Sequence, residues 1–193
     1  ILTFIDNGIS IEWIKKTGAK VQNLLAKGSI NHLKYQLKKT AKDHFYDIEI
    51  ILKNATKNNI KTNIYLEDWS NGMKDSKDYV FNFLNFIKNQ PVDRVLLPDT
   101  LGVLNPFETS KFLKEINNNY PNIHFDFHAH NDYDLSVANT LESIKAGCNG
   151  IHTTINGMGE RAGNTPLASI IAANNDFLKD YNIKINEKNL YNV

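Results

Sequence analysis

The sequence predicts an α/β fold of the (β/α)8-barrel class, with about six of the eight strand–helix units present in 193 residues. Short apolar segments alternate with longer segments whose apolar residues recur at helical spacing. Polar residues follow the later apolar segments at the points where strands would end. The alternative is an open doubly wound sheet, but no Gly-x-Gly-x-x-Gly follows an early strand, so its nucleotide-binding version has no support.

Six strands are expected, each a short apolar run between polar or glycine-containing segments. They are predicted at 1–6, 19–25, 60–66, 94–97, 123–128 and 150–155. The helices are expected to begin at a capping residue or a proline: at Ser29, Thr40, Pro106 and Asp134, and at Asn164 with Pro166. Thr40 and Asp43 resemble a capping box, and Gly147 stands where a left-handed residue would end a helix. Apolar spacing alone predicts helices near 11–16 and 80–87.

The predicted catalytic domain covers residues 1–180, and the polar segment 181–193 is expected to begin a linker to a missing carboxyl-terminal region. Ile1 already lies in a predicted strand, so we expect the chain to be a fragment whose two absent strand–helix units precede it.

The composition excludes several partners. With 22 basic and 21 acidic residues, the chain offers no reason to expect nucleic acid or an anionic membrane. No apolar stretch approaches the roughly 20 residues of a membrane span. The single cysteine, Cys148, allows no intrachain disulfide and favours the cytoplasm, where we expect it to be an inert structural thiol.

The motif His128-Ala129-His130 predicts part of a metal site. Residues two apart on a strand face the same way, so both imidazoles would share one face at the carboxyl end of a strand. Two such imidazoles make half of a divalent-cation site, although polar residues at a strand end are the simpler alternative.

Polar groups at other strand ends strengthen this prediction, because barrel enzymes place their chemistry at that edge. These groups are Glu67, Asp68, Asp99, Thr100, Thr153 and Thr154. Each could instead be a helix cap, Asp68 and Asp99 above all.

The glycine-rich segment 156–164 is the second signal. Its three glycines would let the backbone approach a ligand, and the Asn164 carboxamide oxygen could bind a hard cation. The alternative is a flexible loop with a buried Glu160–Arg161 pair, closed by Asn164 as a cap.

Together these motifs resemble the signature of the 2-isopropylmalate and homocitrate synthase family, metal-dependent barrels related to the hydroxymethylglutaryl-CoA lyases. The resemblance covers nearly the whole chain, and the glycine-rich segment is its most specific part. The segments that carry it are 65–68, 97–102, 128–132, 137–139 and 156–164.

Residue by residue, the resemblance implies that His128 and His130 are ligands of a divalent metal (manganese, zinc or magnesium), with Asn164 at or next to it. Thr100 matches a threonine that binds the carboxylate of a 2-keto acid. Glu67 matches an acidic residue beside the reacting centre, and we expect it to assist the acid–base steps.

The implied activity is a Claisen-type condensation of acetyl-CoA with a 2-keto acid, by a cytoplasmic homodimer of leucine biosynthesis. Glu160 is a further candidate catalytic residue, and Leu96 and Thr154 are candidate substrate contacts. We expect 2-ketoisovalerate as the acceptor. An apolar wall at Leu96 suits a branched chain, and no Arg or Lys stands at the predicted strand ends to offset a second carboxylate.

The chain departs from the family in two respects. Asp134 stands where the family commonly has a glycine. Nothing matches the first-strand Asp and Arg or the carboxyl-terminal domains, so the isolated chain is expected to be inactive. The alternatives are a sister synthase that makes homocitrate or citramalate, a hydroxymethylglutaryl-CoA-type lyase, against which 159–164 argues, and a non-catalytic fragment.

Overall fold

Six parallel strands form one sheet in the computed structural model, which describes residues 1–178. They follow chain order, each pairing in parallel with the next: β1 Leu2–Thr3, β2 Val21–Lys27, β3 Lys61–Glu67, β4 Arg94–Asp99, β5 Phe125–Ala129 and β6 Gly150–His152. Sequential parallel order with helical crossovers is the topology of a βα barrel, so the sheet is a partial (β/α)8 barrel. The prediction of six strands is confirmed.

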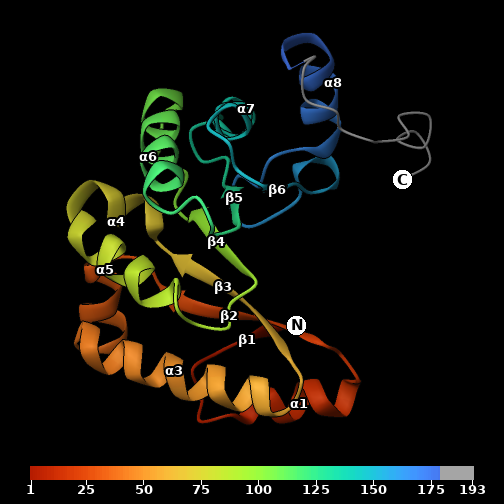
Figure 1. Cartoon of the computed structure of the whole chain (residues 1–193). Helices are drawn as coiled ribbons and strands as arrows, with labels where there is room; N and C mark the ends of the chain where they lie inside the picture. The colour runs from red at the N-terminus through yellow and green to blue at the C-terminus, as the bar shows by residue number, and fades with distance from the viewer. Residues whose placement is uncertain (179–193) are drawn as a thin grey trace.

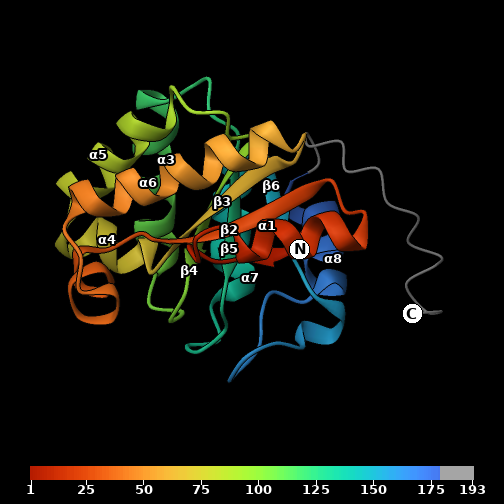
Figure 2. The same ribbon diagram turned by 90° about the horizontal axis from the view of Figure 1, so that it is seen from below.

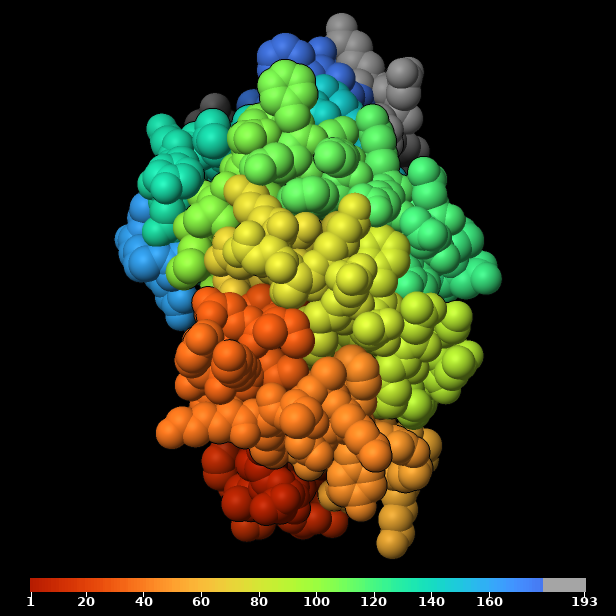
Figure 3. All heavy atoms as spheres, turned by 90° about the vertical axis from the view of Figure 1, so that its left-hand side faces the viewer, coloured from red at the N-terminus to blue at the C-terminus, as the bar shows by residue number. Residues whose placement is uncertain are grey.

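The helices lie around the outside of the curved sheet (Figures 1 and 2). They are α1 Ile9–Thr17, α2 Ile30–His32, the π-helical η1 Leu33–Leu37, α3 Ala41–Lys57, α4 Trp69–Asp75, α5 Lys77–Ile87, α6 Pro106–Asn119, α7 Ser136–Lys145, the 3₁₀ turn η2 Ile155–Gly157 and α8 Leu167–Phe177. Figure 3 shows one outer face, covered by α3, α4, α5 and α6. None of the described helices is long and apolar enough to cross a membrane.

Strand alternation gives the sheet two different faces. Leu24, Ile64, Leu97 and Phe127 belong to the main apolar cluster, which the strands share with the surrounding helices. The residues that alternate with them, among them Asn63, Tyr65, Leu96, Asp126 and His128, face the inside of the barrel. The inner face is therefore the polar one. Cys148 packs against the apolar cluster, and burial raises its pKa to about 12, as expected of an inert thiol.

The first strand is shorter than the predicted 1–6. It spans only Leu2–Thr3, because the Asp6 carboxylate accepts the Ser10 N–H at 3.1 Å and so helps to start α1. Asn7 and Gly8 turn the chain into that helix with positive φ angles of 57° and 91°.

The helix α4 was not predicted. Trp69 and Met73 are buried in it, but its polar composition and Gly72 hid the helical pattern. Gly72 is required by packing, because a Cβ there would lie 2.1 Å from the carbonyl oxygen of Gly28.

Most predicted caps are confirmed: Ser29, the Thr40–Asp43 capping box, Pro106 in the first turn of α6, and Gly147 at φ 90° after α7. Of the predicted pair Asn164 and Pro166, Pro166 directly precedes α8. One start differs. Asp134 does not cap α7, since it has φ 58° and the Asn131 side chain accepts the Ser136 N–H. The left-handed backbone of Asp134 is the conformation that glycine adopts most readily, which explains why the resemblance implied a glycine at this position. The predicted linker 181–193 lies outside the described residues.

Candidate active site

The carboxyl ends of the six strands meet at one edge of the sheet, as parallel pairing requires. The predicted metal ligands converge there from two segments. His128 lies in β5 and His130 just beyond it, with their ring centroids 5.1 Å apart. The Asn164 amide nitrogen lies 3.2 Å from His128 Nε2 and donates to the Ala129 carbonyl at 3.0 Å. A backbone bridge between His130 and Asn164 holds the segments together.

Both imidazoles are held in the neutral form. Burial, followed by the neighbouring His152 and His130, lowers the pKa of His128 to about 4. Burial, followed by Arg161, lowers the pKa of His130. Neutral imidazole is the form that binds a metal, so both residues are prepared for that role at neutral pH.

These residues fit a two-histidine portion of a cation site. His130 Nδ1 is buried and has no hydrogen-bond partner among the described residues. However, the described residues contain no group of three His, Cys, Asp or Glu side chains that could hold a metal. Asn164 presents its nitrogen, rather than the predicted oxygen, to His128, and its oxygen faces Gly159.

The glycines of 156–164 let the loop pack on itself. A Cβ on Gly159 would lie 1.9 Å from Asn164 Oδ1, and one on Gly163 would lie 2.1 Å from the Gly157 carbonyl oxygen. Gly163 also has φ 93°, which a residue with a side chain rarely adopts. The packing that requires these glycines is therefore internal to the loop, whereas the sequence predicted close approach to a ligand.

Arg161 ties this loop to two other strand ends. Its guanidinium donates to both Asp132 carboxylate oxygens, at 2.7 and 2.8 Å, and to the Thr100 carbonyl at 2.8 Å. The hydrogen bonds from Arg161 are the largest cause that lowers the pKa of Asp132. Arg161 and Glu160 do pair, at 3.6 Å, but the Glu160 side chain is 78% exposed. The buried pair of the alternative interpretation is therefore wrong, and the main partner of Arg161 is Asp132.

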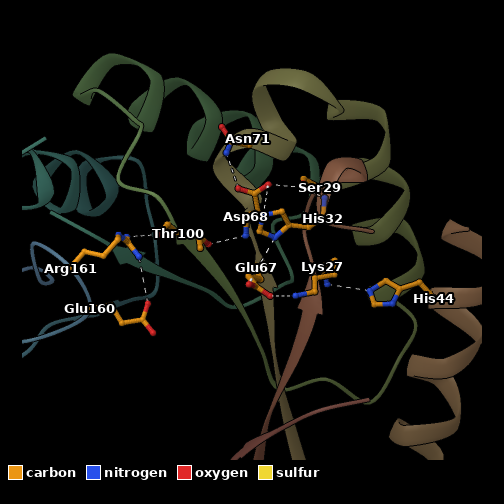
Figure 4. A network of polar contacts seen from close by, with 10 residues as sticks. All are labelled: Lys27, Ser29, His32, His44, Glu67, Asp68, Asn71, Thr100, Glu160 and Arg161. Atoms are coloured by element: carbon orange, nitrogen blue, oxygen red, sulfur yellow. Dashed lines mark hydrogen bonds and ion pairs between the residues drawn. The ribbon is translucent and has the colours of Figure 1, made fainter. Parts of the chain in front are cut away.

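A second polar network occupies the ends of β2 and β3 (Figure 4). Lys27 forms an ion pair with Glu67, its partner in strand register. His32 lies between two carboxylates, 3.9 Å from Glu67 and 3.6 Å from Asp68. Asp68 also accepts from the Ser29 hydroxyl at 2.6 Å. Lys27 was missed because the predicted strand ended at residue 25.

The predicted substrate contacts lie on the same edge or the inner face. The Thr100 hydroxyl accepts the Asp68 N–H at 2.8 Å, which leaves its own proton free to donate. Leu96 is 2% exposed and stands in register between Tyr65 and Asp126. Thr154 Oγ1 is buried without a hydrogen-bond partner among the described residues. Glu160, in contrast, points to solvent beside Arg161 (Figure 4).

Comparison with known proteins identifies the family of the chain. Residues 7–193 match the sequence pattern of the HMGL-like family. A homocitrate synthase from Saccharolobus islandicus is 36% identical over 142 residues, which are 74% of this chain and 30% of that protein. One from Sulfolobus acidocaldarius is 34% identical over 145 residues, or 75% of this chain and 30% of that protein. The chain therefore spans about 30% of the length of these curated relatives.

Solved structures of two lyases share the fold. Hydroxymethylglutaryl-CoA lyase from Pseudomonas aeruginosa superposes with a TM-score of 0.84 at 17% identity, covering 99% of this chain and 66% of that one. An HMG-CoA lyase from Acinetobacter baumannii, in complex with coenzyme A and 3-methylmalate, superposes with a TM-score of 0.81 at 17% identity. The match covers 99% of this chain and 65% of that one. The two relatives named above are homocitrate synthases, which favours the sister-synthase alternative over the expected 2-isopropylmalate synthase.

Proposed function

Because the chain belongs to the HMGL-like family, we propose that the natural protein containing it condenses acetyl-CoA with a 2-keto acid. The observation that carries this proposal is the convergence of His128, His130 and Asn164 at the carboxyl edge of a partial (β/α)8 barrel. A divalent cation bound there would act as a Lewis acid on the ketone of the keto acid.

Residues of this chain would bind the reactants and move the protons. The free Thr100 proton can donate to the carboxylate of the keto acid. The Glu67 carboxylate, paired with Lys27, can accept a proton from the methyl group of acetyl-CoA. The resulting enolate carbon bonds to the ketone carbon, and the former ketone oxygen takes a proton. Water then hydrolyses the thioester and releases CoA.

For the acceptor we propose a dicarboxylic 2-keto acid of the 2-ketoglutarate kind. The homocitrate synthases among the relatives support it. Lys27 also supports it, because it places a lysine, paired with Glu67, at the end of β2, whereas the sequence predicted no Arg or Lys at any strand end. A positive charge offsets the cost of burying a second carboxylate. The homodimer and the cytoplasmic location remain part of the proposal.

The test measures CoA release by the natural protein containing these residues, with 2-ketoglutarate, 2-ketoisovalerate and pyruvate as acceptors. We expect the highest kcat/KM with 2-ketoglutarate and a loss of activity in the His130→Ala variant. A preference for 2-ketoisovalerate would indicate the 2-isopropylmalate type, and a preference for pyruvate the citramalate type. Cleavage of hydroxymethylglutaryl-CoA without any condensation would contradict the proposal.

A further inference from the structure

Two inner-face residues that are not among the predicted metal ligands form a chain of contacts with His128: His152 contacts His128, and Asp126 contacts His152. His152 in β6 is the register partner of His128, and their Nδ1 atoms lie 3.2 Å apart. The other ring nitrogen of His152, Nε2, lies 3.5 Å from Asp126 Oδ2. Asp126 is 3% exposed, and a Cβ on Gly150 would lie 2.2 Å from its Oδ1, so only glycine leaves room for it.

The Asp126 carboxylate is fixed from its other side as well. Arg94 lies 3.3 Å from Oδ2 and His124 Nε2 lies 2.8 Å from Oδ1. Together with the contact from His152, these neighbours fix the position of the buried Asp126 carboxylate.

The hydrogen bonds of Asn164 indicate which nitrogen of His128 carries the proton. Asn164 Nδ2 donates one N–H to the Ala129 carbonyl, which identifies this atom as the nitrogen of the amide. Its second N–H faces His128 Nε2 at 3.2 Å. An N–H donor needs a lone pair opposite it, so the proton of neutral His128 is on Nδ1.

The contacts of His152 require the same arrangement. If His128 Nδ1 donates, His152 Nδ1 accepts, and the proton of His152 is on Nε2, facing the Asp126 carboxylate. The reverse arrangement would set a His152 lone pair against that carboxylate. It would also set a His128 N–H against the Asn164 amide N–H. All three contacts therefore agree on one tautomer.

We propose that Asp126 and His152 are positioning residues that hold His128 as its Nδ1–H tautomer, so that Nε2 carries a lone pair, which a divalent cation would bind in place of the Asn164 N–H. The inference rests on the metal site of the proposed function but is independent of the keto acid. Groups that hydrogen-bond to a metal-binding histidine in this way typically change metal affinity by about 10–100-fold.

Two substitutions of His152 separate positioning from packing. His152→Leu fills the space but cannot accept a hydrogen bond. His152→Asn places an amide oxygen near the position of Nδ1 and can still accept from His128. Long-range ¹H–¹⁵N NMR of the metal-free chain at neutral pH reports the tautomer of His128 directly. Calorimetric titration with Zn²⁺ reports affinity, and thermal unfolding by circular dichroism checks the fold.

We expect the Nδ1–H tautomer in the parent chain and in His152→Asn, and a shift toward Nε2–H in His152→Leu. Zn²⁺ affinity should fall at least about tenfold in His152→Leu and stay within about threefold of the parent in His152→Asn. An Nε2–H tautomer in the parent chain would overturn the inference, and so would equal effects of the two variants. If no variant and no parent bound Zn²⁺, the metal site would be wrong, and the tautomer would still decide this inference.

Discussion

At the end of β5 the inner face carries buried, neutral imidazoles, whereas at the ends of β2 and β3 it carries charged groups paired with one another. His128 and His130 have lowered pKa values because burial disfavours the protonated ring. Lys27 and Glu67 are also largely buried, with side chains 12% and 23% exposed, but each neutralises the other. The two halves of one sheet edge therefore accommodate titratable groups in opposite ways.

This difference separates two kinds of chemistry. A neutral imidazole keeps a lone pair for a cation, so the β5 half is suited to binding a metal. In the β2–β3 half the carboxylate of Glu67 already has a cation beside it, and His32 lies within 4 Å of two carboxylates. That half is suited to moving protons and to holding a charged substrate. Each prediction below tests one side of the comparison.

The largest effect on stability is expected from breaking the Lys27–Glu67 pair. Lys27→Met leaves the Glu67 carboxylate largely buried without its cation, which should lower the free energy of unfolding by about 2–3 kcal/mol. The double variant Lys27→Met/Glu67→Gln should recover much of that loss. Urea denaturation measures both. Lys145→Met is the matched control, because its pair with Glu142 is more exposed, at 44% and 28%, and should cost less than about 1 kcal/mol. Equal losses at Lys27 and Lys145 would remove the distinction between the two pairs.

A somewhat smaller effect is expected from acid, through His44. This buried imidazole accepts the Lys27 N–H at 3.2 Å, and burial lowers its pKa from 6.5 to about 4. Its folded pKa lies below its unfolded value, so the stability it contributes is present above pH 6.5 and is lost as the pH falls toward 4.

Between pH 7 and pH 5, protonation of His44 should lower the free energy of unfolding by about 2 kcal/mol. His44→Gln keeps an acceptor for the Lys27 N–H but cannot be protonated, so its unfolding free energy should depend less on pH. Some dependence of stability on pH should remain in the variant, because the pKa of His128 is also lowered to about 4. Identical pH profiles for the parent and His44→Gln would contradict this account.

The smallest effect is expected at Arg161. Arg161→Lys keeps the charge but loses the two parallel hydrogen bonds to Asp132. Because Arg161 is 40% exposed, we expect a loss of about 1 kcal/mol or less in global stability. The glycine-rich loop should nevertheless open more often, which hydrogen exchange at residues 156–164 would detect. Unchanged exchange rates there would show that Arg161 does not hold the loop.

The sequence allowed most of the fold to be predicted, because apolar spacing and caps are local signals. Thr40 with Asp43, Pro106 and Gly147 all behaved as their residue types suggest. Local signals failed where contacts with distant parts of the chain determine the backbone conformation. The helix α4 exists because Trp69 and Met73 are buried by other elements. Asp134 adopts a left-handed backbone while Asn131 provides the cap.

The site divides in the same way. The convergence of His128 and His130 was predictable because strand alternation puts them on one face. The pair Lys27–Glu67 spans 40 residues and follows only from strand register. His152 was likewise missed, because it lies on the neighbouring strand β6, and only through His152 does Asp126 act on His128.

The most direct test of the central claim is a calorimetric titration of the metal-free chain with Mn²⁺ or Zn²⁺. We expect one cation per chain, with His128→Ala and His130→Ala each weakening the affinity at least about tenfold. His44→Gln, which replaces a buried histidine at the β2 side of the edge rather than at the end of β5, should bind like the parent. Equal binding by the parent, His128→Ala and His130→Ala would contradict the assignment of this edge as a metal site.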